Sequence, residues 1–137
     1  MEVLLSIKPE FAHKIFDGTK RFEYRRVIFK NPKIKKIVVY ASAPISKVIG
    51  EFDIEEVLSD EPKSLWNDTK NYSGISKSYF EKYFQGKDVG FAIKVKRTKK
   101  YRKPKCIYET YGIKPPQSFT YIKRTLSTIE QSDLNHN

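Results

Sequence analysis

Residues 18–26 read GTKRFEYRR, a glycine followed by eight residues that carry five charges around two aromatic rings. The alternation of charged and aromatic residues predicts a strand over residues 20–29. Because side chains on a strand alternate between two faces, we expect Glu23 and Arg25 on one face, and Lys20 can turn toward them from the start of the strand. These charges either point into water or converge on a ligand that needs two cations and a carboxylate.

The two interpretations of this charged face differ in energy and in chemistry. We expect Phe22, Tyr24 and Arg26 on the opposite face of the strand, toward the core. On a solvated surface, an ion pair between Glu23 and a neighbouring cation would contribute only ~0–1 kcal/mol. In a cleft, a carboxylate between two cations can accept amino groups on the edge of a nucleobase, while the cations bind phosphate or carbonyl oxygens.

The segments around this stretch predict an α+β domain with one curved, mixed sheet. Pro9 is typical of a helix start and Gly18 of a helix end, and helical patterns cover residues 9–17, 61–70 and 76–85. Residues 1–122 are expected to form one domain, and residues 123–137 a polar, flexible tail. We expect extended segments at residues 3–7, 20–29, 35–43, 47–59, 85–101, 106–113 and 115–122.

The composition indicates a folded protein of the cytoplasm. The chain has 137 residues, enough for one domain, and 39% of them are hydrophobic. Cys106 is the only cysteine, which excludes an internal disulfide and favours a reducing compartment. No apolar run approaches the ~20 residues that cross a bilayer, so we expect no membrane partner. The N-terminal residues lack the pattern of a signal peptide.

The net charge of +11 is concentrated in two segments. Residues 20–36 hold eight lysines and arginines against one glutamate, and residues 94–105 hold eight with no acid. Such segments favour a polyanion, because each neutralised phosphate releases counterions. A solvated basic face would have the same composition. The second segment predicts a rim that contacts phosphates through Lys99, Lys100, Arg102 and Lys103.

The opening stretch also carries a known motif. The pattern G-x-K-x-x-E-x-R covers residues 18–25, and strands that contain YASAP and IGEF follow it. From about residue 2 to residue 122 the chain resembles the small stand-alone ASCH domain proteins of prokaryotes and phages, a branch of the PUA-like superfamily. The resemblance implies a small mixed β-barrel of five to seven strands, with short helices at its openings. It also implies a cleft beside the motif that binds RNA or a nucleotide-like ligand.

Residues outside the motif are expected to complete such a cleft. The first strand ends beside a helix start, where backbone donors attract anions. Aromatic residues near the predicted loop at 71–74 can stack on a base, and two prolines hold the polar groups after them rigidly. The candidate ligand-binding residues are Ser6, Lys8, Lys20, Glu23, Arg25, Arg26, Ser42, Trp66, Tyr72, Gln117 and Ser118.

An enzymatic function is the first alternative. Some bacterial ASCH proteins are amidohydrolases that act on acetylated cytidine, with the motif lysine as nucleophile, a threonine three residues later and a glutamate in the later helical region. Lys20 matches the lysine, but Glu23 replaces the threonine, and the helical region offers Asp68 and Asn71 in place of a clear glutamate. A lysine nucleophile needs a lowered pKa, which a neighbouring carboxylate would raise. Lys20 and Glu23 are catalytic candidates only if the protein is an enzyme.

Other classes of function have weaker support in the sequence. His13, His136 and Cys106 are too few and too scattered for a zinc site, so we expect no metal and no other cofactor. A second alternative is a basic adaptor that binds a protein partner, which a shallow salt dependence of binding would distinguish from a nucleic-acid binder. The sequence therefore favours a protein that binds nucleic acid, RNA before DNA, or a nucleotide-like ligand.

Overall fold

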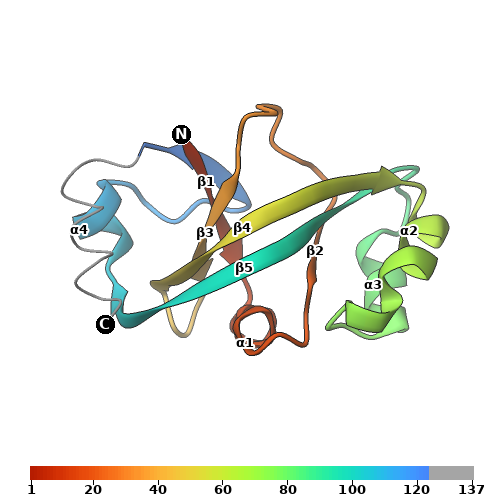
Figure 1. The fold of residues 1–137 in the computed structure, drawn as a ribbon, viewed down its shortest axis with the longest axis horizontal. Coiled ribbons are helices and arrows are strands. Elements are labelled where there is room, and N and C mark those ends of the chain that lie inside the picture. Colours follow the sequence, from red (N-terminus) through yellow and green to blue (C-terminus); the bar gives the residue numbers. More distant parts are fainter. Residues whose placement is uncertain (124–137) are drawn as a thin grey trace.

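One mixed, six-stranded sheet forms the centre of the molecule, in a computed structural model that describes residues 1–123 (Figure 1). The strand order is β2-β5-β4-β3-β1-β6; β1 and β3 are parallel, and the other neighbours are antiparallel. The strands are β1 (Glu2–Ile7), β2 (Phe22–Arg25), β3 (Lys36–Ala41), β4 (Lys47–Asp60), β5 (Gly90–Lys105) and β6 (Phe119–Ile122). This architecture confirms the α+β prediction. The predicted tail lies, apart from Lys123, outside the described residues.

Short helices surround the sheet. They are α1 (Pro9–Asp17), α2 (Pro62–Thr69), the 3₁₀ helix η1 (Lys70–Tyr72), α3 (Lys77–Tyr83) and α4 (Ile107–Tyr111). Figure 1 shows α2 and α3 at one end of the long β4–β5 ribbon and α4 at the other. Pro9 begins α1, and Gly18 ends it with a φ of 89°. Among residues 1–123, no helix is long and apolar enough to span a bilayer.

Two predicted strands differ from the structure by more than a shift of their ends. The strand expected over residues 20–29 ends at Arg25, because β5 pairs with β2 only as far as Phe91. The segment 106–113 is the helix α4 and not a strand. Ile107 and Tyr111 lie one helical turn apart and pack on the same hydrophobic cluster, so the helical spacing outweighs the β-propensity of the aromatic residues.

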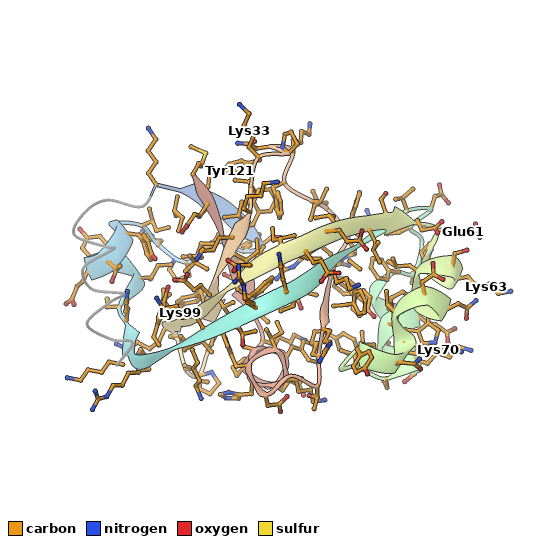
Figure 2. The ribbon with its side chains drawn as sticks, viewed as in Figure 1. Lys33, Glu61, Lys63, Lys70, Lys99 and Tyr121 are labelled. Atoms are coloured by element: carbon orange, nitrogen blue, oxygen red, sulfur yellow. The ribbon has the colours of Figure 1, made fainter. Side chains whose placement is uncertain are left out.

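The sheet is buried on both faces along β1. Val3, Leu5 and Ile7 pack in the cluster that contains α1, whereas Leu4 packs with Ile107 of α4 on the other face. Burying such side chains stabilises the fold by about 1.5–3 kcal/mol each. Many charged side chains lie outside this core, and Figure 2 shows Lys33, Lys63 and Lys70 extending from the periphery.

A third cluster attaches the helices α2 and α3 to β2. Phe22 and Tyr24 pack with Leu65 of α2, with Phe80 of α3 and with Phe84, which directly follows α3. The rings of Tyr24 and Phe80 meet edge to face, with centroids 5.0 Å apart. The expected orientation of Phe22 and Tyr24 toward a core is therefore confirmed, and this packing sets α3 beside the motif strand.

Candidate functional site

Arg25 bridges the two edges of the curved sheet. The strand β2 forms one edge and β6 the other. Arg25 Nη2 donates to the backbone oxygen of Ser6 in β1 at 2.8 Å, and Nη1 donates to Oγ of Ser118, just before β6, at 3.3 Å. A backbone hydrogen bond from Ser6 N to Ser118 O, at 3.0 Å, holds the two acceptors together. One side chain from the motif thus spans the seam between the edge strands.

A cavity of about 510 Å³ opens at this seam. Its volume lies within the range of about 300–1,000 Å³ that is usual for small-ligand sites. Residues from α1, β2, α3 and the segment before β6 contribute to its walls. They are Lys8, Phe11, Lys20, Glu23, Tyr24, Arg25, Arg26, Val27, Ile75, Tyr79, Tyr83, Gln117, Ser118 and Phe119.

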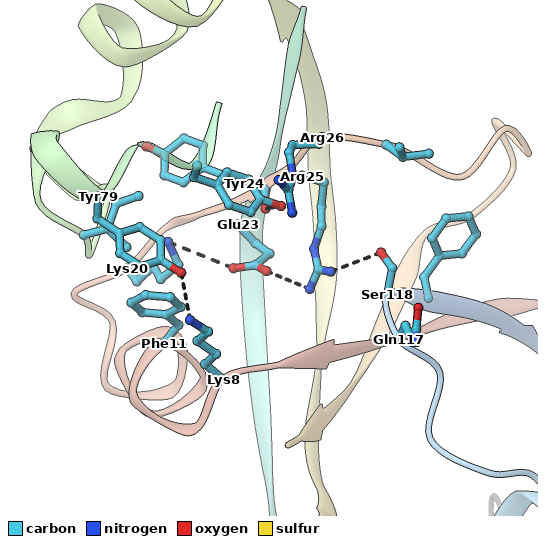
Figure 3. Close-up of a pocket in the computed structure, with 14 residues that line it drawn as sticks. Lys8, Phe11, Lys20, Glu23, Tyr24, Arg25, Arg26, Tyr79, Gln117 and Ser118 are labelled. Carbon is cyan, nitrogen blue, oxygen red and sulfur yellow. Dashed lines mark hydrogen bonds and ion pairs between the residues drawn. The ribbon is translucent and has the colours of Figure 1, made fainter. Parts of the chain in front are cut away.

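Three charged side chains are buried together in this pocket. Lys20, Glu23 and Arg25 are only 1%, 5% and 8% exposed. Arg25 Nη2 lies 2.9 Å from Oε2 of Glu23, and Lys20 Nζ lies 4.0 Å from Oε1 of the same carboxylate. Figure 3 shows this row of contacts continuing to Ser118. Buried ionisable groups that face one cavity are typical of functional sites.

Lys20 is the most deeply buried of the three charged groups. Its Nζ donates to the backbone oxygen of Ser73 at 2.6 Å and lies 4.7 Å from the ring centroid of Tyr24. Burial lowers the pKa of Lys20 to about 8, and this effect outweighs the Glu23 carboxylate, which raises the pKa; Lys14 and Arg25 lower it further. Glu23 raises the pKa of Lys20, as the sequence predicts, but the burial of Lys20, whose depth the sequence does not reveal, has the larger effect.

Tyrosines and two cations form one wall of the pocket. Tyr79 and Tyr83 lie one turn apart on α3, with centroids 6.4 Å apart and planes at 13°. Lys8 Nζ lies 5.3 Å from the ring centroid of Tyr79, and Arg26 Cζ lies 4.6 Å from that of Tyr83. Arg26 is exposed, which corrects its expected orientation toward the core: β2 has ended at Arg25, so the strand alternation no longer applies.

A comparison with protein families identifies the chain. The family model described as the ASCH domain matches residues 5–114. The chain belongs to the ASCH domain family. The resemblance that the motif at residues 18–25 suggested is thereby confirmed.

Relatives of this ASCH domain differ widely in length. It is 34% identical over 125 residues to the large ribosomal subunit protein uL22 of Ureaplasma parvum, and 34% identical over 123 residues to the ATP synthase subunit alpha of the same species. Each match covers 88% of this chain, but the chain spans only 39% of the first protein and 15% of the second. A Zymomonas mobilis protein called an ASCH domain-containing ribonuclease is 28% identical, over 90% of this chain and 85% of its own.

Solved structures confirm the PUA-like architecture of this ASCH domain. The crystal structure of ASCH from Zymomonas mobilis superposes with a TM-score of 0.86 at 28% identity, covering 97% of this chain and 94% of that one. The N-terminal domain of McrB from Staphylothermus marinus, at 15% identity and a TM-score of 0.55, shares the fold. The predicted PUA-like fold, with a mixed sheet and short helices, is therefore confirmed; its six strands form a half-barrel where the sequence predicts a small barrel.

Seven of the candidate residues of this ASCH domain lie around one pocket. These are Lys8, Lys20, Glu23, Arg25, Arg26, Gln117 and Ser118. Ser6 does not line the pocket but supports its far wall, because its Oγ donates to the backbone oxygen of Pro116 at 2.6 Å. The sequence thus located the charged part of the pocket.

The remaining candidates lie elsewhere in the ASCH domain. Trp66 packs on Phe80, with centroids 4.9 Å apart, and Tyr72 is half exposed beneath the guanidinium of Arg21. Ser42 Oγ donates to the backbone oxygen of Ile7 at 3.4 Å. None of them lines the pocket. The predicted rim residues Lys99, Lys100, Arg102 and Lys103 belong to the far half of β5 and do not line it either.

Sequence reasoning missed the aromatic wall of the ASCH pocket. Phe11, Tyr79, Tyr83 and Phe119 all line the cavity. A signal was present for two of them: Tyr79 and Tyr83 are four residues apart in a predicted helix and must therefore lie on the same face. The sequence does not reveal which neighbour that face meets, because this depends on the packing of α3 against β2.

Gly74 gives a test of how tightly this ASCH domain encloses Lys20. A Cβ atom at Gly74 would lie 2.5 Å from Cβ of Lys20, and its φ is 67°. We expect Gly74→Ala to lower the free energy of unfolding by about 2–4 kcal/mol, from left-handed backbone strain and overpacking together. Urea denaturation measures the loss. Gly86→Ala is the control, because Gly86 has a φ of 80° but an added Cβ atom would meet no atom within 4 Å. Only the backbone strain applies there, so the free energy of unfolding should fall by about 1–2 kcal/mol. Equal losses in the two variants would contradict the close packing.

Proposed function

We propose that this ASCH domain binds RNA by holding one unpaired nucleotide in the seam pocket. The observation that carries the proposal is the buried carboxylate of Glu23, flanked by Lys20 and Arg25 at the base of an aromatic-walled cavity. Charge, burial and aromatic walls together suit a flat, polar base better than an apolar ligand. The Zymomonas relative that is called a ribonuclease supports RNA as the ligand class.

Each part of the pocket has a distinct role in this proposal. Glu23 accepts hydrogen bonds from amino groups on the base edge, as carboxylates do with cytosine N4. The rings of Tyr79 and Tyr83 stack on or enclose the base. Arg25 Nε is buried without a hydrogen-bond partner among residues 1–123. An unsatisfied donor at this position favours a ligand or water that brings an oxygen acceptor.

The ligand class is tested with a panel of labelled nucleic acids. Fluorescence anisotropy is measured with single-stranded RNA, single-stranded DNA, duplex RNA and duplex DNA, with free nucleosides as competitors. The proposal predicts tightest binding to single-stranded RNA and competition by at least one nucleoside, because the pocket takes a base that is not paired. Equal affinity for duplexes and single strands, with no competition by any nucleoside, would contradict it.

The affinity for single-stranded RNA is expected to depend on pH through Lys20. The pKa of Lys20 is lowered to about 8, so its ammonium group is present below pH 8 and is lost as the pH rises through 8. If the ammonium donates to the ligand, the dissociation constant rises by up to about tenfold per pH unit above 8. The pKa of Tyr24 beside it is raised to about 12 by burial, so this group does not titrate in the same range. Lys20→Met should weaken binding below pH 8 and remove this rise; an equal rise in that variant would exclude Lys20 as its source.

A second candidate function is hydrolysis in the same pocket. The observation that favours it is the lowered pKa of Lys20, since a group that titrates near neutral pH transfers protons efficiently. The substrate is either the bound RNA, as the name of the Zymomonas relative suggests, or an acylated nucleoside. End-labelled RNA and acetylated cytidine are incubated with wild type and with Lys20→Met. Turnover that the substitution removes supports an enzyme, and no turnover of either substrate leaves binding as the function.

We also propose that the far half of β5 contacts phosphates. Replacing Lys99, Lys100, Arg102 and Lys103 with alanine together is expected to weaken binding evenly across RNA sequences. The slope of log affinity against log salt should become shallower by about one unit for each phosphate contact removed. Anisotropy titrations at several salt concentrations measure both. An unchanged affinity and slope would contradict phosphate contacts. β2 pairs with β5 only over Phe91–Lys94, so the rest of this edge of β5 has no partner strand in β2. The four cations would then serve only to keep other strands from pairing with that edge.

A further inference from the structure

We propose that Lys8 and Arg26 bind the two phosphates that flank the nucleotide in the pocket. The ligand is then an internal nucleotide of a single strand, and not a free nucleoside or a strand end. This inference rests on the proposed function, because it takes the base to lie against Glu23. It adds which form of the nucleotide the protein selects.

The two cations lie on different sides of the buried carboxylate. Lys8 comes from the connection between β1 and α1, and Arg26 directly follows β2. Both are exposed, and both line the pocket. Figure 3 shows Lys8 and Arg26 apart from each other, with Glu23 between them. A base that reaches Glu23 therefore has one exposed cation on each side.

The tyrosine pair fixes the positions of these cations. Lys8 Nζ donates to Oη of Tyr79 at 3.1 Å, and the guanidinium of Arg26 covers the ring of Tyr83. Because Tyr79 and Tyr83 are held one turn apart on α3, the two cations lie at the two ends of one rigid pair of rings. Cation–π contact already restricts the side chain, so a lysine or arginine held in this way loses less conformational entropy when it binds a ligand.

The charges of Lys8 and Arg26 are available to a ligand. Among the described residues 1–123, neither side chain forms an ion pair with a carboxylate, in contrast to Lys94 with Glu55 and Arg97 with Asp53. The pocket mouth therefore carries two uncompensated positive charges, while the negative charge of Glu23 at its base is compensated by Arg25.

Phosphates fit this pair of cations better than other groups of a nucleotide. Guanidinium and ammonium groups form strong, charge-assisted hydrogen bonds to phosphate oxygens. A nucleoside has no phosphate, a mononucleotide has one, and an internal nucleotide has one on each side. The structure therefore predicts that affinity rises with each phosphate. The alternative is that the cations only cover the tyrosine rings and remain solvated.

Isothermal titration calorimetry with the four ribonucleosides and their 3′,5′-bisphosphates tests the inference. With wild-type protein at low salt, we expect the best-bound bisphosphate to bind at least about tenfold more tightly than its nucleoside. Lys8→Ala and Arg26→Ala should each reduce this advantage by about threefold or more. A mononucleotide with a single phosphate should give an intermediate affinity.

Two matched variants serve as controls. Arg21 is an exposed arginine that also covers a tyrosine ring, that of Tyr72, but does not line the pocket. Lys63 is an exposed lysine of α2 outside the pocket. Arg21→Ala and Lys63→Ala should leave the advantage of the bisphosphate unchanged. If all four variants lost a similar part of the bisphosphate's affinity advantage, that advantage would come from the overall positive charge of the protein and not from Lys8 and Arg26. This result would overturn the inference.

The outcomes separate this inference from the proposed function. If nucleosides bind and bisphosphates bind no more tightly, the flanking contacts do not exist, while a base pocket remains. If neither nucleosides, bisphosphates nor single-stranded RNA bind, both the proposed function and this inference are wrong. A gain from the bisphosphate that Lys8→Ala and Arg26→Ala leave intact would overturn the assignment of these two residues.

Discussion

Replacing Arg25 with alanine is expected to lower the free energy of unfolding by about 3–5 kcal/mol, because it leaves a buried carboxylate without its cation. Glu23 is 5% exposed, and its Oε2 depends on Arg25 Nη2 at 2.9 Å. The substitution also removes the contacts to Ser6 O and Ser118 Oγ that span the seam. Urea denaturation followed by circular dichroism measures the loss.

A control substitution and a double substitution distinguish the loss of the buried ion pair from the loss of any arginine side chain. Arg21→Ala removes an exposed arginine from a tyrosine ring and should cost about 1 kcal/mol or less. Removing both charges, in Glu23→Gln with Arg25→Met, should cost less than the two single substitutions added together, because neither partner is left unpaired. A loss below about 1 kcal/mol for Arg25→Ala would show that this residue does not hold the seam.

Replacing Glu23 with glutamine is expected to weaken the binding of single-stranded RNA by about thirtyfold or more. The amide has the shape of the carboxylate but lacks its charge, and losing one member of a buried, hydrogen-bonded charge contact typically costs about 2–5 kcal/mol. The nitrogen of the amide also faces an amino group on the base, where a second donor cannot be accommodated. Fluorescence anisotropy with labelled RNA measures the change.

Stability must be followed in the same experiment, since Glu23→Gln leaves Lys20 and Arg25 without their carboxylate. Circular dichroism confirms that the variant is folded at the temperature of the titration. Glu81→Gln changes an exposed glutamate of α3 and should bind like the wild type. A folded Glu23→Gln variant with wild-type affinity would remove the base-reading role from this residue.

The sequence predicted the local part of the site because strand alternation and the motif are local properties. Glu23 and Arg25 share the pocket face of β2, and Phe22 and Tyr24 pack in the cluster under α2 and α3. The depth of Lys20 could not be predicted in the same way. The pattern places Lys20 at the start of a strand, but the backbone at Gly74 approaches so closely that the side chain is enclosed.

The other failures also come from contacts between distant segments. The bridge from Arg25 to Ser6 and Ser118 depends on how far the sheet curves, which a pattern along one strand does not specify. Trp66 looked available to a base but packs on Phe80, because α2 and α3 bury their shared face against β2. Short-range spacing, in contrast, could have identified Ile107 and Tyr111 as one face of a helix.

Mapping the amide signals of ¹⁵N-labelled protein during a titration with single-stranded RNA locates the binding site. If RNA binds in the seam pocket, the largest chemical-shift changes are expected at Lys20, Glu23, Arg25 and residues 117–119, and these changes should be lost in folded Glu23→Gln. Changes confined to the far half of β5, at residues 96–105, would contradict binding in the pocket. So would RNA binding that leaves the signals around the pocket unmoved.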